Sequence, residues 1–197
     1  MDKAQADIIS IAIIVLIALS LTATALMWGL PIIQKRQDSA IVTRVNNLIT
    51  QDLISKIKNV ANTGGSELFY IDVKGGWSID ESKNILSFTF FSKATDKATG
   101  IWIGGGECQP NGFNGKNGTL GYSEPCVVCM RSDPVIDGYN ITYQIGCREI
   151  WNPEGTKGYK IELKSAGIER SISKTIKISQ RAVKSDTLII TEVEILL

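Results

Sequence analysis

The four cysteines are the residues of this chain with the clearest potential chemistry. They follow the pattern C-x17-C-x2-C-x17-C and are Cys108, Cys126, Cys129 and Cys147. An even number of cysteines in one segment beyond an apolar span predicts two disulfides in an oxidising compartment. Three pairings fit: Cys108–Cys126 with Cys129–Cys147, Cys108–Cys147 with Cys126–Cys129, and the crossed pairing. The first would close the loop between Cys108 and Cys126, worth about 3 kcal/mol in the chain-entropy model.

Two other cysteine chemistries compete with disulfides. Four thiolates could bind zinc, but such sites typically have two C-x2-C pairs and this chain has one. Cys126 and Cys129 could form a redox C-x-x-C pair, but no thioredoxin-like βαβ pattern surrounds them. Disulfides are therefore the preferred interpretation.

Other catalytic chemistry finds little support. The chain has no histidine, which excludes histidine bases, Ser-His-Asp triads and histidine metal ligands. Asp80 and Glu81 lie between two strand-like runs and are interpreted as an acidic turn. We predict no catalytic residue, no metal and no cofactor. The 21 basic and 20 acidic residues give a net charge of +1, which argues against a nucleic-acid partner.

Two asparagines are candidates for glycosylation. Asn117 and Asn140 each begin an N-x-Thr triplet. Asn117 lies in a loop with three Asn-Gly pairs, and Asn-Gly suits exposed turns with positive φ. These Asn-Gly pairs therefore predict an exposed loop. The same loop lacks the series of carboxylates that a calcium site uses.

These residues follow a long apolar segment. No residue from Ile8 to Gln34 is charged, and a helix of this length, at about 1.5 Å per residue, exceeds a hydrocarbon core of about 30 Å. Residues 5–34 are predicted to form a membrane-spanning helix. Its orientation is contested. Lys35, Arg36 and Arg44 after the span favour a domain inside the cell, whereas the cysteines and glycosylation triplets favour one outside.

The span carries two further signals. Ala23-Thr24-Ala25 could be a signal-peptidase site, but the apolar run continues past it. Small residues follow one helical face at 4-3-4 spacing, which favours close helix packing: Ala18, Thr22, Ala25 and Gly29.

The helix is expected to continue as an amphipathic segment over residues 35–64. Apolar residues recur every three or four positions, and Gly64-Gly65 predicts the end. The apolar stripe is Val42, Val45, Ile49, Leu53, Ile57 and Val60. It must be buried either against the chain's own domain or also against neighbouring copies.

Residues 65–197 have the pattern of one β domain. Apolar residues alternate in several short runs, exemplified by Leu86-Ser87-Phe88, and glycine-rich turns separate the runs. The predicted fold class is α+β: a long N-terminal helix, apolar then amphipathic, followed by an antiparallel, sandwich-like β domain.

The opening DKAQADIISIAIIVLIALS resembles the class III signal of archaeal type IV pilin-like proteins. In that family a short basic leader precedes a hydrophobic helix that is retained after cleavage. The family pattern maps onto Lys3, Ala4 and Gln5. The resemblance implies that residues 1–4 are a leader, which a prepilin peptidase removes on the cytoplasmic side.

The resemblance also implies orientation and fate. The domain would lie outside the cell, and assembly machinery would draw the subunit from the membrane into a homo-oligomeric helical filament with the apolar helices at its core. Asp7 would become the third residue, where it is expected to offset the amino-terminal charge of a neighbour. The leader is less basic, and the domain more charged, than is usual in the family.

Two other classes of function are compatible with the sequence. A monomeric anchored protein could use the β domain to bind a surface layer, a sugar or another protein. An anchored enzyme is the weakest alternative, because no set of catalytic side chains is recognisable.

Overall fold

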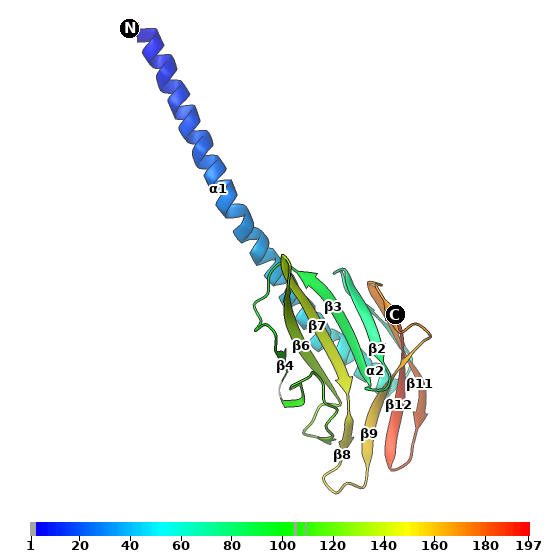
Figure 1. Cartoon of the computed structure of the whole chain (residues 1–197). Coiled ribbons are helices and arrows are strands. Elements are labelled where there is room, and N and C mark those ends of the chain that lie inside the picture. Colours follow the sequence, from blue (N-terminus) through cyan, green and yellow to red (C-terminus); the bar gives the residue numbers. More distant parts are fainter. Residues whose placement is uncertain (1–2, 105, 109) are drawn as a thin grey trace.

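The α+β fold class is confirmed by a computed structural model of the chain, in which one long helix precedes two β-sheets (Figure 1). The structure describes the backbone of residues 3–104, 106–108 and 110–197, and the side chains of these residues from position 10 onward. The first part of the helix projects away from the β domain, and its last part lies against it.

The helix is one continuous rod made of three segments. α1 (Lys3–Asn47) is followed by the π-helical segment η1 (Leu48–Leu53) and by α2 (Ile54–Thr63). Gly64 ends the rod with φ of 80°, a left-handed conformation that favours glycine, and its N–H donates to the carbonyl of Val60 at 3.0 Å.

The apolar stripe of the second half of the rod is fully buried by the chain's own domain. Its six members are exposed by no more than 1%: Val42, Val45, Ile49, Leu53, Ile57 and Val60. They share one core cluster with residues of both sheets. The rod is therefore apolar and then amphipathic, as expected of the fold class, and the burial of its stripe does not depend on neighbouring copies.

The π-helical segment explains how the stripe stays on one face. Val45, Ile49, Leu53 and Ile57 are separated by three successive steps of four residues. On an α-helix each such step overshoots a full turn by about 40°, so the stripe would drift around the rod. The wider turn of a π-helix removes much of that drift. The segment η1 lies in the middle of this run.

Within the described residues, each β-sheet has six strands. The first sheet has the order β1 (Ser66–Tyr70), β11 (Thr175–Lys184), β12 (Leu188–Leu196), β9 (Gly158–Ser165), β8 (Glu149–Trp151) and β5 (Gly118–Thr119). The second has the order β10 (Arg170–Ser171), β2 (Gly75–Asp80), β3 (Ile85–Ser92), β7 (Gly138–Cys147), β6 (Cys126–Val135) and β4 (Trp102–Ile103). A short 3-10 helix, η2 (Gly106–Cys108), precedes the Asn-Gly loop.

The alternating segments of the sequence form the central strands. Leu86, Phe88 and Phe90 lie on the buried face of β3, and similar alternation of buried and less buried residues occurs in β7, β9, β11 and β12. Most strand pairs are antiparallel, as expected. However, β12 pairs with β9 in parallel over eight residue pairs, and β5 pairs with β8 in parallel, so the first sheet is mixed.

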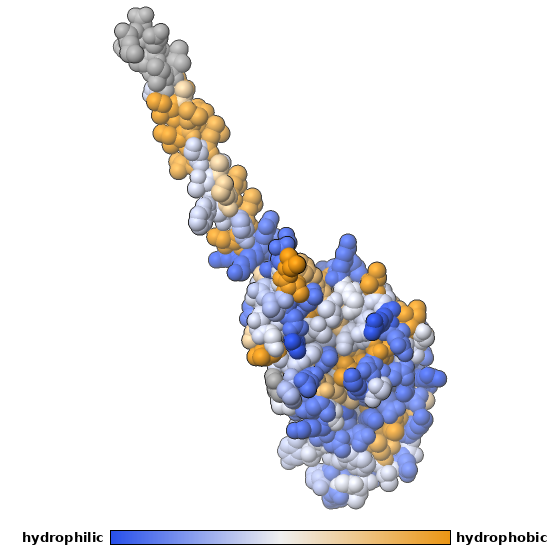
Figure 2. Space-filling view, viewed as in Figure 1, coloured by the Kyte–Doolittle hydropathy of each residue, from blue (hydrophilic) through white to orange (hydrophobic). Residues whose placement is uncertain are grey.

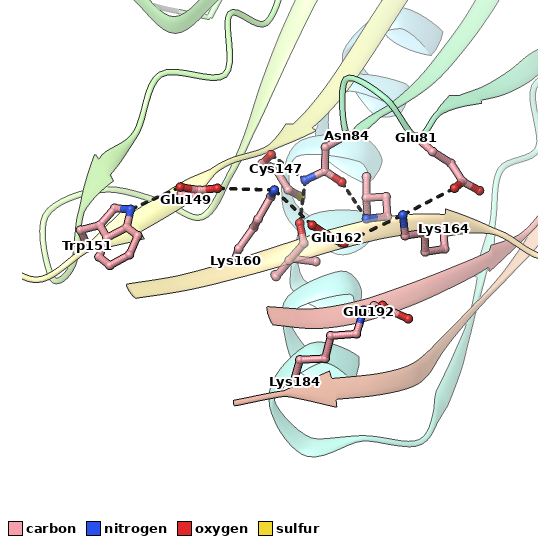
Figure 3. Close-up of polar contacts among 12 residues, drawn as sticks. Glu81, Asn84, Cys147, Glu149, Trp151, Lys160, Glu162, Lys164, Lys184 and Glu192 are labelled. Atoms are coloured by element: carbon pink, nitrogen blue, oxygen red, sulfur yellow. Dashed lines mark hydrogen bonds and ion pairs between the residues drawn. The ribbon is translucent and has the colours of Figure 1, made fainter. Parts of the chain in front are cut away.

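Side chains of the β2–β3 turn form hydrogen bonds with backbone groups along one edge of β9. On one side, β8 pairs only with residues 158–160 of β9. Beyond that point, Asn84 donates to the carbonyls of Cys147 and Ile161 and accepts from the N–H of Leu163, each at 2.7 Å. Glu81 accepts from the N–H of Ser165 at 2.8 Å. Figure 3 shows both side chains reaching this edge. The turn therefore ties the second sheet to the first.

Replacing Asn84 by alanine is expected to lower the free energy of unfolding by about 2–4 kcal/mol, because three hydrogen bonds are lost and alanine is strained at positive φ. Asn84 has φ of 58°. Asn84→Gly removes the same bonds without the strain. Thermal unfolding of both variants separates the two causes. Wild-type stability of Asn84→Gly would show that these bonds contribute little.

Candidate assembly and membrane surface

The first part of α1 exposes a continuous apolar surface. Its large apolar side chains from Ile11 to Ile33 are 50–73% exposed, and Figure 2 shows this apolar stretch along the projecting helix. The helix is long and apolar enough to cross a membrane. A surface of this extent requires an apolar environment, which a bilayer or other copies of the same helix can supply.

The hydroxyl groups within this segment are satisfied by the helix itself. Ser20 donates to the carbonyl of Leu16, Thr22 to that of Ala18, and Thr24 to that of Ser20, each at 2.8 Å. A hydroxyl bonded in this way brings no unpaired donor into hydrocarbon. The polar side chains of the segment are therefore compatible with lipid and with a neighbouring helix.

The predicted small-residue face lies on this free part of the helix. Ala18, Thr22 and Ala25 are exposed and Gly29 is half-buried. A Cβ added at Gly29 would meet no atom within 4 Å, so packing within the chain does not explain this glycine. Four small residues at this spacing leave room for a second helix to approach.

The predicted processing residues lie at the start of α1. The backbone of Lys3, Ala4, Gln5 and Asp7 is helical. Their side chains lie outside the described part of the structure, as do Met1 and Asp2 altogether. Their predicted roles therefore remain predictions.

The four cysteines form two disulfides in the crossed pairing. Cys108 bonds Cys129 and Cys126 bonds Cys147, with Cα atoms 5.5 and 4.0 Å apart. Cys126 and Cys147 face each other across β6 and β7, where strand register brings them together. The pairings Cys108–Cys126 with Cys129–Cys147, and Cys108–Cys147 with Cys126–Cys129, are therefore wrong, and so are the zinc and redox interpretations of these sulfurs.

The disulfide between Cys108 and Cys129 lies outside the main core. Both cysteines are fully buried in a smaller cluster with Trp102, against which Phe113 and Val127 pack. Arg148 supports the neighbouring loop by donating to the Glu124 carbonyl at 3.0 Å and to the Glu107 carboxylate at 3.2 Å. The backbone N–H of Glu107 itself, and then the guanidinium of Arg148, hold the pKa of the Glu107 carboxyl below its ordinary value by hydrogen bonding to it.

Both glycosylation candidates are accessible. Asn117 is exposed in the loop before β5, and Asn140 is exposed on β7. Asp80 is the last residue of β2 and Glu81 begins the β2–β3 turn, so the acidic pair lies where β2 enters the turn. The Ser82 hydroxyl and the Lys83 N–H donate to the Asp80 carboxylate, which holds its pKa below the ordinary value.

An ion-pair network covers the outward face of the first sheet. Figure 3 shows Lys160 between Glu149 and Glu162, with nitrogen–oxygen distances of 3.5 and 3.1 Å, and Lys164 near Glu81 at 3.6 Å. Because the charges compensate one another, this face offers no basic track for a polyanion. Among the described residues, no group of three or more His, Cys, Asp or Glu side chains could hold a metal ion.

Two features were missed by the sequence interpretation. Asn84 has no distinguishing pattern beyond its place in a turn. Ile136 stands at the β6–β7 turn and is 89% exposed. The sequence could have indicated that Ile136 is unusual, because a two-residue turn ordinarily favours asparagine, aspartate or glycine.

Comparison with protein-family models, with curated proteins and with solved structures finds no match to this chain. Its function is therefore inferred from the chemistry of the chain itself and from the resemblance of its opening residues.

Proposed function

We propose that this protein is a structural subunit of an archaeal type IV pilus-like cell-surface filament, as a major or a minor pilin. It would polymerise through the apolar part of α1 and serve in adhesion or surface attachment. The observation that supports the proposal is the difference in burial between the two halves of the rod. Its second half is fully buried by the chain's own domain, while residues 10–33 remain uncovered.

The same surface suits two environments in succession. Burying one large apolar side chain contributes about 1.5–3 kcal/mol, whether lipid or a sister helix covers it. The helix could therefore wait in a membrane and later enter a filament core. The Ala18, Thr22, Ala25 and Gly29 face would set the spacing of neighbouring helices.

An extracellular position of the domain agrees with its chemistry. Two disulfides are typical of an oxidising compartment, and both glycosylation candidates are exposed. The precursor would be anchored with its amino terminus inside the cell, where a prepilin peptidase and the assembly machinery act on it.

The processing prediction can be tested by intact-mass analysis of the native protein. The expected mature chain begins at Gln5, because the resemblance places the cut after Ala4. Ala4→Leu is expected to retain Met1, since it removes the small residue at the cut, whereas Ala6→Leu is the matched control. Retention of Met1 in the wild-type chain would remove the main argument for a pilin.

Electron microscopy of sheared cell-surface material then distinguishes a polymer from an anchor. Filaments that contain the chain support the proposal. In this assay Asp7→Ala is expected to lower filament yield, because a neighbour's amino-terminal charge would be left uncompensated; a normal yield would contradict that role. A processed chain without filaments favours the alternative, a membrane-anchored β domain that binds or assists another protein.

A further inference from the structure

The β6–β7 hairpin extends to the end of the domain from which α1 emerges (Figure 1). The two strands pair without interruption from Cys126–Cys147 to Val135–Gly138, and Ile136 and Asp137 form the turn. The opposite end of the hairpin lies near α2, because Glu124, two residues before Cys126, forms an ion pair with Lys58. The hairpin therefore runs back along the rod toward its apolar part.

The length of the hairpin places its turn at the end of the apolar segment. Ten residues of β-strand span about 34 Å, and β6 has ten residues. At about 1.5 Å per residue, this length corresponds to about 22 residues of helix. Counted back from Lys58, the turn lies near Arg36, where the uncharged run from Ile8 to Gln34 has just ended.

A groove beside the helix independently places the turn at the same level along the rod. Gln34 and Gln37 of α1 line it together with Phe91, which lies in β3, and Lys93, which follows the end of that strand. The hairpin contacts this groove, because a Cβ added at Gly138 would lie 2.6 Å from the ring of Phe91. The base of the turn therefore packs where the helix would leave a bilayer.

The side chains at this place suit the boundary between lipid and water. Ile136 is 89% exposed, Val135 is 40% exposed and the neighbouring Phe91 is 48% exposed. Figure 2 shows apolar surface at the base of the helix, where Figure 1 draws this turn. An isoleucine so exposed adds almost nothing to the core and is a poor turn former.

The surrounding charges restrict the depth of any insertion. Lys35, Arg36 and Lys93 are exposed near the same level and can reach lipid phosphates. Asp137 is also exposed and must remain in the headgroup layer. Asp133 is paired with Arg131 at 2.7 Å. The arrangement fits shallow contact rather than entry into the hydrocarbon centre.

We propose that the β6–β7 turn, through Ile136 and Val135, inserts into the membrane interface while α1 spans the bilayer. This inference depends on the membrane-anchored stage of the proposed function. A single helix leaves the domain free to tilt relative to the bilayer, and a second contact at the interface restricts that tilt. The turn would thus set the tilt and height at which the domain is held above the membrane.

The test uses the full-length chain in vesicles of phosphatidylcholine and phosphatidylglycerol. All four native cysteines are in disulfides, so one added cysteine can be labelled with the fluorophore NBD. Ile136→Cys is the test, and Tyr122→Cys is the matched control, because Tyr122 is also 89% exposed. Tyr122 lies near the Lys58–Glu124 pair, about 36 Å farther along the rod from Gln34. Ile17→Cys reports the span itself.

Lipids that carry a quencher near the headgroup are expected to quench the label at 136 at least about fivefold more than the label at 122. If the label at position 17 is quenched and the label at position 136 is not, the inference is overturned, whereas the membrane-anchored stage of the proposed function is unaffected. The label at 136 could instead be shielded from water only at a high protein-to-lipid ratio and without quenching by the lipid. That result would mean that a second copy of the chain covers the turn, and it would also overturn the inference. Without quenching at 17 in lipids labelled along the acyl chain, α1 does not span, and both proposals fail.

Discussion

Leu53→Ala is expected to lower the free energy of unfolding by about 2–5 kcal/mol, because it opens a cavity where the rod meets both sheets. Leu53 is fully buried and ends the π-helical segment. Gln51→Ala is the matched control, since Gln51 is exposed in the same segment. Thermal unfolding of the full-length variants in mild detergent, followed by tryptophan fluorescence, measures the difference.

The outcome also tests how the rod is divided. Because Leu53 lies beyond the apolar part of α1, Leu53→Ala is expected to leave membrane insertion unchanged. Equal unfolding temperatures for the two variants would mean that the stripe is not in the core.

Removing either disulfide is expected to cost about 3 kcal/mol of stability in the chain-entropy model. Each disulfide joins cysteines 21 residues apart, so that model predicts nearly equal losses for Cys126→Ala/Cys147→Ala and for Cys108→Ala/Cys129→Ala. The two double variants therefore serve as controls for each other.

Their difference should lie in where protection is lost. Cys126 and Cys147 belong to the main core, whereas Cys108 and Cys129 hold the smaller cluster around Trp102. Hydrogen exchange is expected to increase only near that cluster in Cys108→Ala/Cys129→Ala. Non-reducing peptide mapping checks the pairing itself, and a peptide that links Cys108 to Cys126 would contradict the structure.

Most of the fold could be predicted from the local periodicity of the sequence. Spacings of three and four residues predicted the buried stripe of the rod, and alternation such as Leu86, Phe88 and Phe90 predicted the central strands. These patterns succeed because each reports which face of a single element is buried.

Information that joins distant elements could not be read in this way. The crossed disulfides depend on the register of β6 with β7, and the parallel pairing of β9 with β12 depends on the sheet order. The role of Asn84 depends on an unpaired edge 77 residues away. The π-helical segment was not predicted, although its signal is local, because three successive steps of four residues indicate an underwound helix.

The parallel pairing has a consequence for how the domain is made. β12 follows every other strand along the chain, yet it lies in the interior of the first sheet between β11 and β9. β12 is therefore synthesised after both of its partners, β9 and β11. The first sheet cannot close, and α2 cannot gain its contacts with β12, before that strand is available. Closure of the first sheet therefore waits for β12, so a chain stalled before this strand would present an open sheet.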